Sequence, residues 1–160
     1  MEGRYLYAGT DSFDEDMRRT LKGEKAGIRI CSLSRDPANE LMWSHYADGH
    51  KGVVIGIDPN HCNCERRPII YDGIHIFTRP SLPKMSAIEI LSHKLTVWEY
   101  EKEERLFIRS GNYVNVVVKE LILGRRMRKN DISFLKDLLK HLNPQIVLRH
   151  AGDIFAQKSS

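Results

Sequence analysis

Two glutamates and an arginine occupy alternate positions near the middle of the chain, in "VWEYEKEERLF". If residues 97–110 form a strand, Glu101, Glu103 and Arg105 project from one face, because side chains alternate along a strand. Neighbouring carboxylates repel each other, so one holds its proton longer, whereas an arginine favours the ionised form. Such a pair can act as a general acid or base, or stabilise a cationic transition state. The alternative is a half-exposed strand with an internal salt bridge.

A second group of candidate residues lies in "LMWSHYADGH", which contains Trp43, His45, Tyr46 and His50. On a helix, residues two apart point away from each other, so Trp43 and His45 cannot share a face, whereas Tyr46 can lie alongside Trp43. His50 falls at the turn into the next strand, where a polar side chain can reach a neighbouring cleft. The group is either the wall of a binding site or a packed helix-to-strand corner.

A third group is the basic segment "GRRMRK", with Arg125, Arg126, Arg128 and Lys129. The chain carries a net charge of +4, and its pI is about 9.0. We interpret the segment as a candidate nucleic-acid contact, with a solvent-facing surface as the alternative.

The cysteine content and the hydrophobicity pattern exclude other classes. Three cysteines, an odd number, argue against a disulfide framework and for a reducing compartment. The loop "HCNC" (61–64) has no second half at zinc-binding spacing, so we predict no metal site. No apolar run is long enough to span a bilayer, and the N-terminus lacks a secretory signal. We therefore expect a cytoplasmic protein without a membrane partner.

Periodicity and capping signals predict the elements that position these residues. Asn39 is a helix cap, and Ser86 with Glu89 has the spacing of a capping box. The predicted helices are 11–25, 39–49, 86–95 and 130–142. The predicted strands are 27–34, 51–58, 69–74, 97–110, 113–124 and 145–151. Strand 51–58 is predicted to be central and to pair with 69–74, residues 58–68 to form a loop, and 156–160 a polar tail. The order indicates one α+β domain over residues 1–160, a curved mixed or antiparallel sheet of about five to six strands with three to four helices packed on it.

Two motifs resemble a bacterial family, domain-of-unknown-function family 2971. The first is "ICSLSRDPANELMWSHYADGHKGVVIGID", with its Met-Trp-x-His-Tyr-Ala-x-x-His-x-Gly core. The second is "HKLTVWEYEKEERLFI", which matches Lys-x-x-x-Trp-x-Tyr-Glu-x-Glu-x-Arg through Lys94, Trp98, Tyr100, Glu101, Glu103 and Arg105. The resemblance covers about residues 20–155. The family carries a longer segment before the first motif, so we expect an N-terminally shortened member.

The family is distantly similar to ADP-ribosyltransferase-like proteins, and its members occur in phage-defence and toxin settings. This similarity implies NAD as a substrate rather than a tightly held cofactor. His45 and Tyr46 would line a nicotinamide cleft, Glu101 or Glu103 would steady the ribosyl cation, and Arg105 would hold that glutamate or a phosphate. Trp43, His50, Lys94 and Trp98 complete the candidate binding residues. The implied acceptor is a protein or a nucleic acid. A non-catalytic protein-interaction module and a nucleic-acid-associated defence protein stay open as alternative functions, and a homo-oligomer stays open as the assembly.

Overall fold

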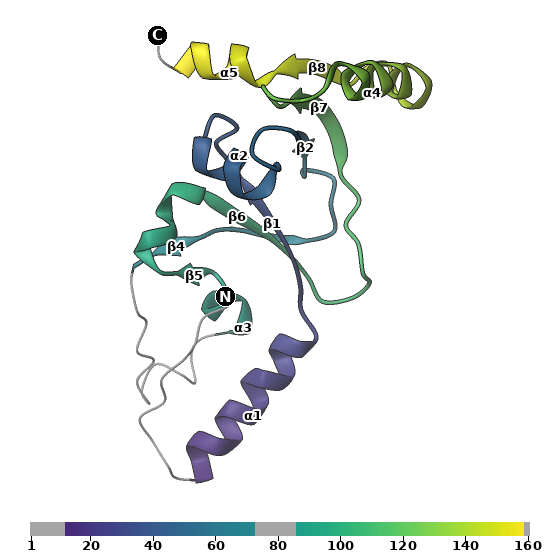
Figure 1. Cartoon of the computed structure of the whole chain (residues 1–160). Coiled ribbons are helices and arrows are strands. Elements are labelled where there is room, and N and C mark those ends of the chain that lie inside the picture. Colours follow the sequence, from purple (N-terminus) through teal and green to yellow (C-terminus); the bar gives the residue numbers. More distant parts are fainter. Residues whose placement is uncertain (1–11, 73–85, 159–160) are drawn as a thin grey trace. The chain divides into compact units, whose positions relative to one another are not determined.

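The computed structural model describes residues 12–72 and 86–158 (Figure 1). Helices and strands both contribute, which confirms the predicted α+β class. The chain divides into two compact units, Met1–Arg35 with Cys64–Tyr113 and Asp36–Asn63 with Val114–Ser160. Each unit has a three-stranded sheet of its own, so the sheets are smaller than the five to six strands predicted.

The first unit is built around the strand β6. Its elements are α1 (Ser12–Ala26), β1 (Arg29–Ser34), β3 (Glu65–Pro68), β4 (Ile70–Tyr71), α3 (Ala87–Ile90), β5 (His93–Lys94), the 3-10 helix η2 (Thr96–Glu101) and β6 (Glu103–Ile108). β6 lies between β1 and β3 and is antiparallel to both, whereas β4 and β5 form a separate parallel pair. The core of this unit consists of Ile28, Ala87, Ile88 and Phe107.

The second unit is built around the strand β7. Its elements are α2 (Glu40–Tyr46), β2 (Val53–Asp58), β7 (Val117–Leu123), α4 (Lys129–Leu142), β8 (Val147–His150) and α5 (Ala151–Lys158). β7 pairs antiparallel with β2 and parallel with β8, and α4 connects the two parallel strands. The core of this unit consists of Ala38, Trp43, Ala47, Ile122, Ala151 and Ile154.

Two predicted caps are confirmed. The Asn39 side chain accepts hydrogen bonds from the backbone N–H groups of Leu41 and Met42, which satisfies two otherwise unpaired donors of α2. Ser86 and Glu89 form a complete capping box at the start of α3. Both helices are shorter than predicted, because α2 ends at Tyr46 and α3 at Ile90.

The predicted strand 97–110 is wrong in its first half. Residues Thr96–Glu101 form a 3-10 helix, and only Glu103–Ile108 form a strand. Lys102 separates them in the left-handed conformation, with a φ of 45°, so the chain changes direction between the two glutamates. Glu and Lys favour helical over extended backbone, which is why the periodicity was misleading here.

Four further predictions about individual elements are corrected. β2 is an edge strand with Ile55 exposed, not a central one. Ile70–Tyr71 pairs with β5 instead of β2, while the rest of the predicted strand 69–74 lies partly outside the described residues. The predicted loop 58–68 contains β3, which ends at Pro68 on the edge of its sheet, where proline is tolerated. Residues 151–158 form α5, where the sequence predicted the end of a strand and a polar tail.

The turn between α2 and β2 is packed against the turn after β7. Asp48, Gly49 and His50 all have positive φ, of 47°, 56° and 68°. The backbone N–H of Gly124 donates to the Gly52 carbonyl over 3.0 Å, and a Cβ at Gly124 would lie 2.1 Å from the His50 carbonyl oxygen. Only glycine allows this approach of two backbones.

We therefore expect Gly124→Ala to lower the free energy of unfolding by about 1–3 kcal/mol, because one backbone must move away from the other. Urea denaturation followed by circular dichroism measures the change. The matched control is Gly152→Ala in α5, where an added Cβ meets nothing within 4 Å. This control should leave stability unchanged or raise it by up to about 1 kcal/mol. Equal stability of the two variants would contradict the close packing of these turns.

Candidate functional site

A buried ion-pair cluster in the first unit brings together Lys94, Glu101 and Glu103. The Lys94 ammonium donates to Glu101 and, over 2.9 Å, to Oε2 of Glu103. Both glutamates are only 4% exposed. Three consecutive elements place them: β5 ends at Lys94, η2 ends at Glu101 and β6 begins at Glu103. The two carboxylates thus share one cation, although they do not lie on one strand.

Arg105 holds the second carboxylate from the other side. Its Nε donates to Oε1 of Glu103 over 2.6 Å, and its Nη1 donates to the carbonyl of Leu91. Glu103 and Arg105 project from the same face of β6, as the strand pattern predicted. Glu104 points to the opposite face and pairs with Arg66 of β3. The resemblance implies that Arg105 holds either a glutamate or a phosphate. The structure has the contact with a glutamate, Glu103.

The pKa shifts of Glu103 and Lys94 favour their charged forms. Burial alone would raise the pKa of the Glu103 carboxyl, but hydrogen bonds from Arg105, Ser32 and Lys94 bring that pKa below its ordinary value. Burial alone would lower the pKa of the Lys94 ammonium, but the hydrogen bonds to both glutamates raise it. Glu103 is therefore an ionised carboxylate at neutral pH, and it does not act as a proton donor there.

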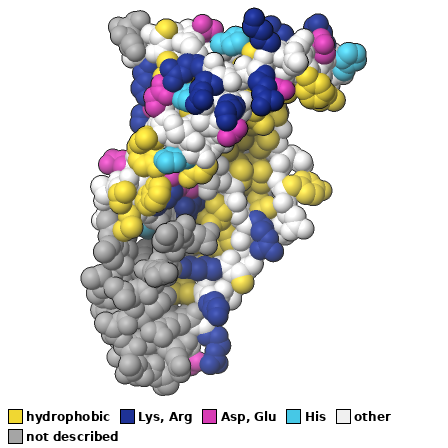
Figure 2. All heavy atoms as spheres, in the orientation of Figure 1, with side chains coloured by type: hydrophobic (Ala, Val, Ile, Leu, Met, Phe, Trp, Pro, Cys, Tyr) yellow, Lys and Arg dark blue, Asp and Glu magenta, His cyan; other side chains and the backbone are white. Residues whose placement is uncertain are grey.

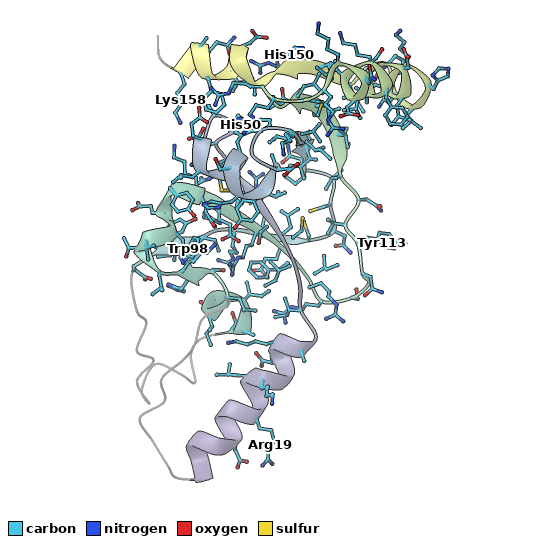
Figure 3. All side chains as sticks on the ribbon, in the orientation of Figure 1. Arg19, His50, Trp98, Tyr113, His150 and Lys158 are labelled. Atoms are coloured by element: carbon cyan, nitrogen blue, oxygen red, sulfur yellow. The ribbon has the colours of Figure 1, made fainter. Side chains whose placement is uncertain are left out.

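Aromatic side chains border the cluster. The Lys94 ammonium lies 5.3 Å from the centroid of the Trp98 ring, in reach of a cation–π interaction, and Trp98 is labelled in Figure 3. The hydroxyl of Tyr71 accepts a hydrogen bond of 2.7 Å from the backbone N–H of Glu103. Burial raises the pKa of Tyr71. Tyr71 was not among the predicted site residues.

A second cluster, in the second unit, joins Glu40, His50 and Arg125. Nε2 of His50 lies 2.7 Å from Oε2 of Glu40, and Nη2 of Arg125 lies 2.6 Å from both oxygens of that carboxylate. The Arg125 guanidinium also stacks on Phe155, 4.6 Å from the ring centroid. Neither Glu40 nor Phe155 was predicted as a site residue. Glu40 and Arg125 are 85 residues apart, so their sequence spacing does not indicate the contact.

The helix-to-strand corner is the interpretation that fits Trp43 and His50. Trp43 is 1% exposed, its ring stacks on His50 with centroids 5.3 Å apart, and its indole N–H donates to the Pro37 carbonyl. His50 is 7% exposed and labelled in Figure 3, and its Nδ1 has no hydrogen-bond partner among the described residues. His45 and Tyr46 are exposed and contact each other edge to face.

The predicted site residues thus fall into two sets. Lys94, Trp98, Glu101, Glu103 and Arg105 form one cluster in the first unit. The remaining candidates, from α2, its following turn and the basic segment, belong to the second unit: Trp43, His45, Tyr46, His50, Arg125, Arg126, Arg128 and Lys129.

The basic segment is exposed. Arg126, Arg128 and Lys129 have no ion pair with a carboxylate in the part of the chain that the structure describes, whereas Arg125 is paired with Glu40. Lys and Arg side chains gather on the visible face in Figure 2, in the upper part of the view, where Figure 1 shows α4 and α5.

The cysteine prediction needs a correction. Cys62 and Cys64 are disulfide-bonded, and Cys31 is a free thiol. An odd cysteine count therefore did not exclude a disulfide, because two of the three cysteines lie close together in one loop.

Within residues 12–72 and 86–158, no group of His, Cys, Asp or Glu side chains is arranged to hold a metal ion. None of the helices there has the length and apolar content of a membrane span.

Comparisons with protein-family models, curated proteins and solved structures found no match.

The pKa shift of Glu103 makes a prediction about acid stability. Since its folded-state pKa is lowered, its contribution is complete above the unfolded-state pKa, about 4.3, and is lost as the pH falls through the folded-state pKa. Glu103→Gln should lower the free energy of unfolding at pH 7 by on the order of 3 kcal/mol, because Lys94 and Arg105 lose a buried counter-charge.

Urea denaturation of both proteins between pH 2 and pH 7 measures this effect, and the difference between them should shrink below about pH 4. The control is Glu99→Gln, at an exposed position of η2, which should leave stability nearly unchanged. A difference that stays constant over this pH range would show that Glu103 does not contribute as an ionised carboxylate.

Proposed function

We propose that the first unit carries an NAD-using site, in which Glu101 and Glu103 stabilise the ribosyl cation that forms when nicotinamide leaves. One observation carries this proposal: two buried carboxylates converge on a single positive charge beside an aromatic ring. The Lys94 ammonium holds that position in the free protein. The proposal also agrees with the motif resemblance, which assigns the same glutamates.

The electrostatic requirement of the reaction fits this cluster. Loss of nicotinamide leaves an oxocarbenium-like ribose, whose charge is spread over C1′ and the ring oxygen. Fixed carboxylates stabilise such a charge strongly, because they need no reorganisation when it develops. The lowered pKa of Glu103 keeps that carboxylate ionised at neutral pH, and the Arg105 contact fixes its orientation.

The proposed reaction breaks the bond between the pyridinium nitrogen of NAD and C1′ of the ribose. The bonding electron pair goes to the nitrogen, so nicotinamide leaves as a neutral molecule. Water or a nucleophilic group of an acceptor then forms the new bond to C1′ and releases a proton. With water, the products are ADP-ribose and nicotinamide.

Access to the carboxylates is the main constraint on this proposal. The side chains of Glu101 and Glu103 are each 5% exposed, whereas that of Lys94 is 23% exposed. NAD can therefore contact the carboxylates only after the Lys94 ammonium moves away from them. Lysine has four flexible side-chain bonds, so this movement needs no change of the backbone. We expect Lys94 to act as a displaceable occupant of the cation position.

The test is release of nicotinamide from NAD, measured by chromatography, for the unaltered chain and for Glu101→Gln and Glu103→Gln. Each variant should lose about 10²–10³-fold in rate, the usual effect of removing one transition-state electrostatic contact. Glu99→Gln serves as the control and should retain the full rate. Thermal denaturation with NAD should show a stabilisation that grows with ligand concentration.

Two results would contradict the proposal. One is nicotinamide release that survives both glutamine substitutions unchanged. The other is an unaltered chain that neither releases nicotinamide nor gains thermal stability from NAD. The second result, together with a loss of stability in the glutamine variants, would favour the non-catalytic interaction module, in which the cluster only supports the fold.

A further inference from the structure

We propose that the turn between β7 and α4, residues 124–129, binds the phosphodiester backbone of a nucleic acid. Arg126, Arg128 and Lys129 are the residues that contact phosphates, and Arg125 is a positioning residue. Every residue in this proposal belongs to the second unit. It therefore does not depend on the NAD-using site proposed for the first unit.

The charge of the turn is the first support. The segment from Gly124 to Asn130 contains four cations and no carboxylate. Of these four cations, Arg125 pairs with Glu40, and the other three have no ion pair with a carboxylate in the described part of the chain. A cation without a protein counter-charge gains most from a phosphate, because no existing ion pair has to be broken.

The rigidity of the turn is the second support. The backbone N–H of Arg126 donates to the His50 carbonyl over 2.9 Å, and that of Met127 donates to the Gly124 carbonyl over 3.2 Å. Gly124 itself approaches the His50 carbonyl too closely for any side chain. The backbone that presents the cations is thus fixed before a ligand binds, which lowers the entropy cost of binding.

Arg125 differs from its neighbours because the protein already uses its guanidinium. Both oxygens of Glu40 lie 2.6 Å from its Nη2, and the Phe155 ring lies beneath it. These contacts attach the turn to α2 and α5. Arg125 therefore orients the segment, and its charge is largely compensated by Glu40.

The start of α4 adds a smaller contribution. Its N-cap residue, Arg128, makes no side-chain capping hydrogen bond, and α4 continues for 14 residues. The first N–H groups of a helix carry a partial positive charge and attract phosphate oxygens. Asp131 in the first turn compensates part of this charge, so the three side-chain cations dominate.

The number and type of the cations favour nucleic acid over an anionic membrane. Segments that bind anionic lipids carry clusters of about four to eight cations, and only three remain here after Glu40 has engaged Arg125. Two of the three are arginines, whose planar guanidinium groups form paired hydrogen bonds with one phosphate. This arrangement fits individual phosphates of a backbone.

Fluorescence anisotropy with a labelled single-stranded RNA and a labelled DNA duplex, at several salt concentrations, tests the proposal. Three phosphate contacts predict that log Kobs falls with log[salt] with a slope of about −2.1 to −2.7. Affinity should then fall roughly 20- to 40-fold between 50 and 200 mM salt. Arg126→Ala, Arg128→Ala and Lys129→Ala should each make the slope less steep by about 0.7 to 0.9.

The positioning role of Arg125 has its own readout. Arg125→Ala should weaken binding but leave the slope unchanged, because it removes no phosphate contact. If Arg125 touched phosphate directly, its substitution would reduce the slope as much as that of Arg126. The matched control is Arg109→Ala, which removes an exposed arginine of the first unit and should change neither quantity.

Three results would overturn the proposal: no salt-dependent binding to either nucleic acid, an equal loss of slope in Arg109→Ala, or binding to phosphatidylserine vesicles without binding to RNA or DNA. Circular dichroism of each variant checks the fold. The three contact side chains are exposed, so their substitution should not unfold the chain. If one variant fails to fold, the other two still decide the outcome.

Discussion

Burial of two carboxylates beside one another is the constraint on which the first unit depends. An ionised carboxylate loses most of its hydration when it is buried, and a second one nearby adds repulsion. Glu101 and Glu103 are both 4% exposed, so the fold must supply positive charge at that point. Lys94 supplies it to both, and Arg105 supplies more to Glu103. The short strand β5 contains Lys94, and the left-handed Lys102 lies between the two glutamates.

The same constraint explains why the strand predicted over residues 97–110 is wrong in its first half. A strand through residues 97–110 would put the side chains of Glu101 and Glu103 on one face at a fixed spacing. The observed turn at Lys102 instead directs both carboxylates to one ammonium. Periodicity predicted correctly that Glu103 and Arg105 share a face, because both lie in β6. It could not predict the turn, which depends on Lys94 from another element.

Local signals were reliable elsewhere, and long-range pairing was not. The caps at Asn39 and Ser86 involve residues within three positions, so their sequence spacing contains the whole interaction. β3, by contrast, lies in a segment rich in turn residues, which predicted a loop, and it becomes a strand through its pairing with β6. The disulfide-bonded state of Cys62 and Cys64 also depends on loop geometry, which a cysteine count does not contain.

The cluster around Glu103 and the cluster around Glu40 both pair carboxylates with basic side chains, but they differ in burial. In each, a carboxylate is shared with basic partners. Glu103 is buried, and its partners Lys94 and Arg105 are only 23% and 13% exposed, so its charge is poorly screened and has a large effect on any charge that develops nearby. The side chain of Glu40 is 54% exposed, so water screens its pairing with Arg125 and the ion pair contributes little stability. The Glu40 cluster therefore suits orientation of an exposed turn, whereas the Glu101–Glu103 cluster has the burial that our proposed NAD-using site requires.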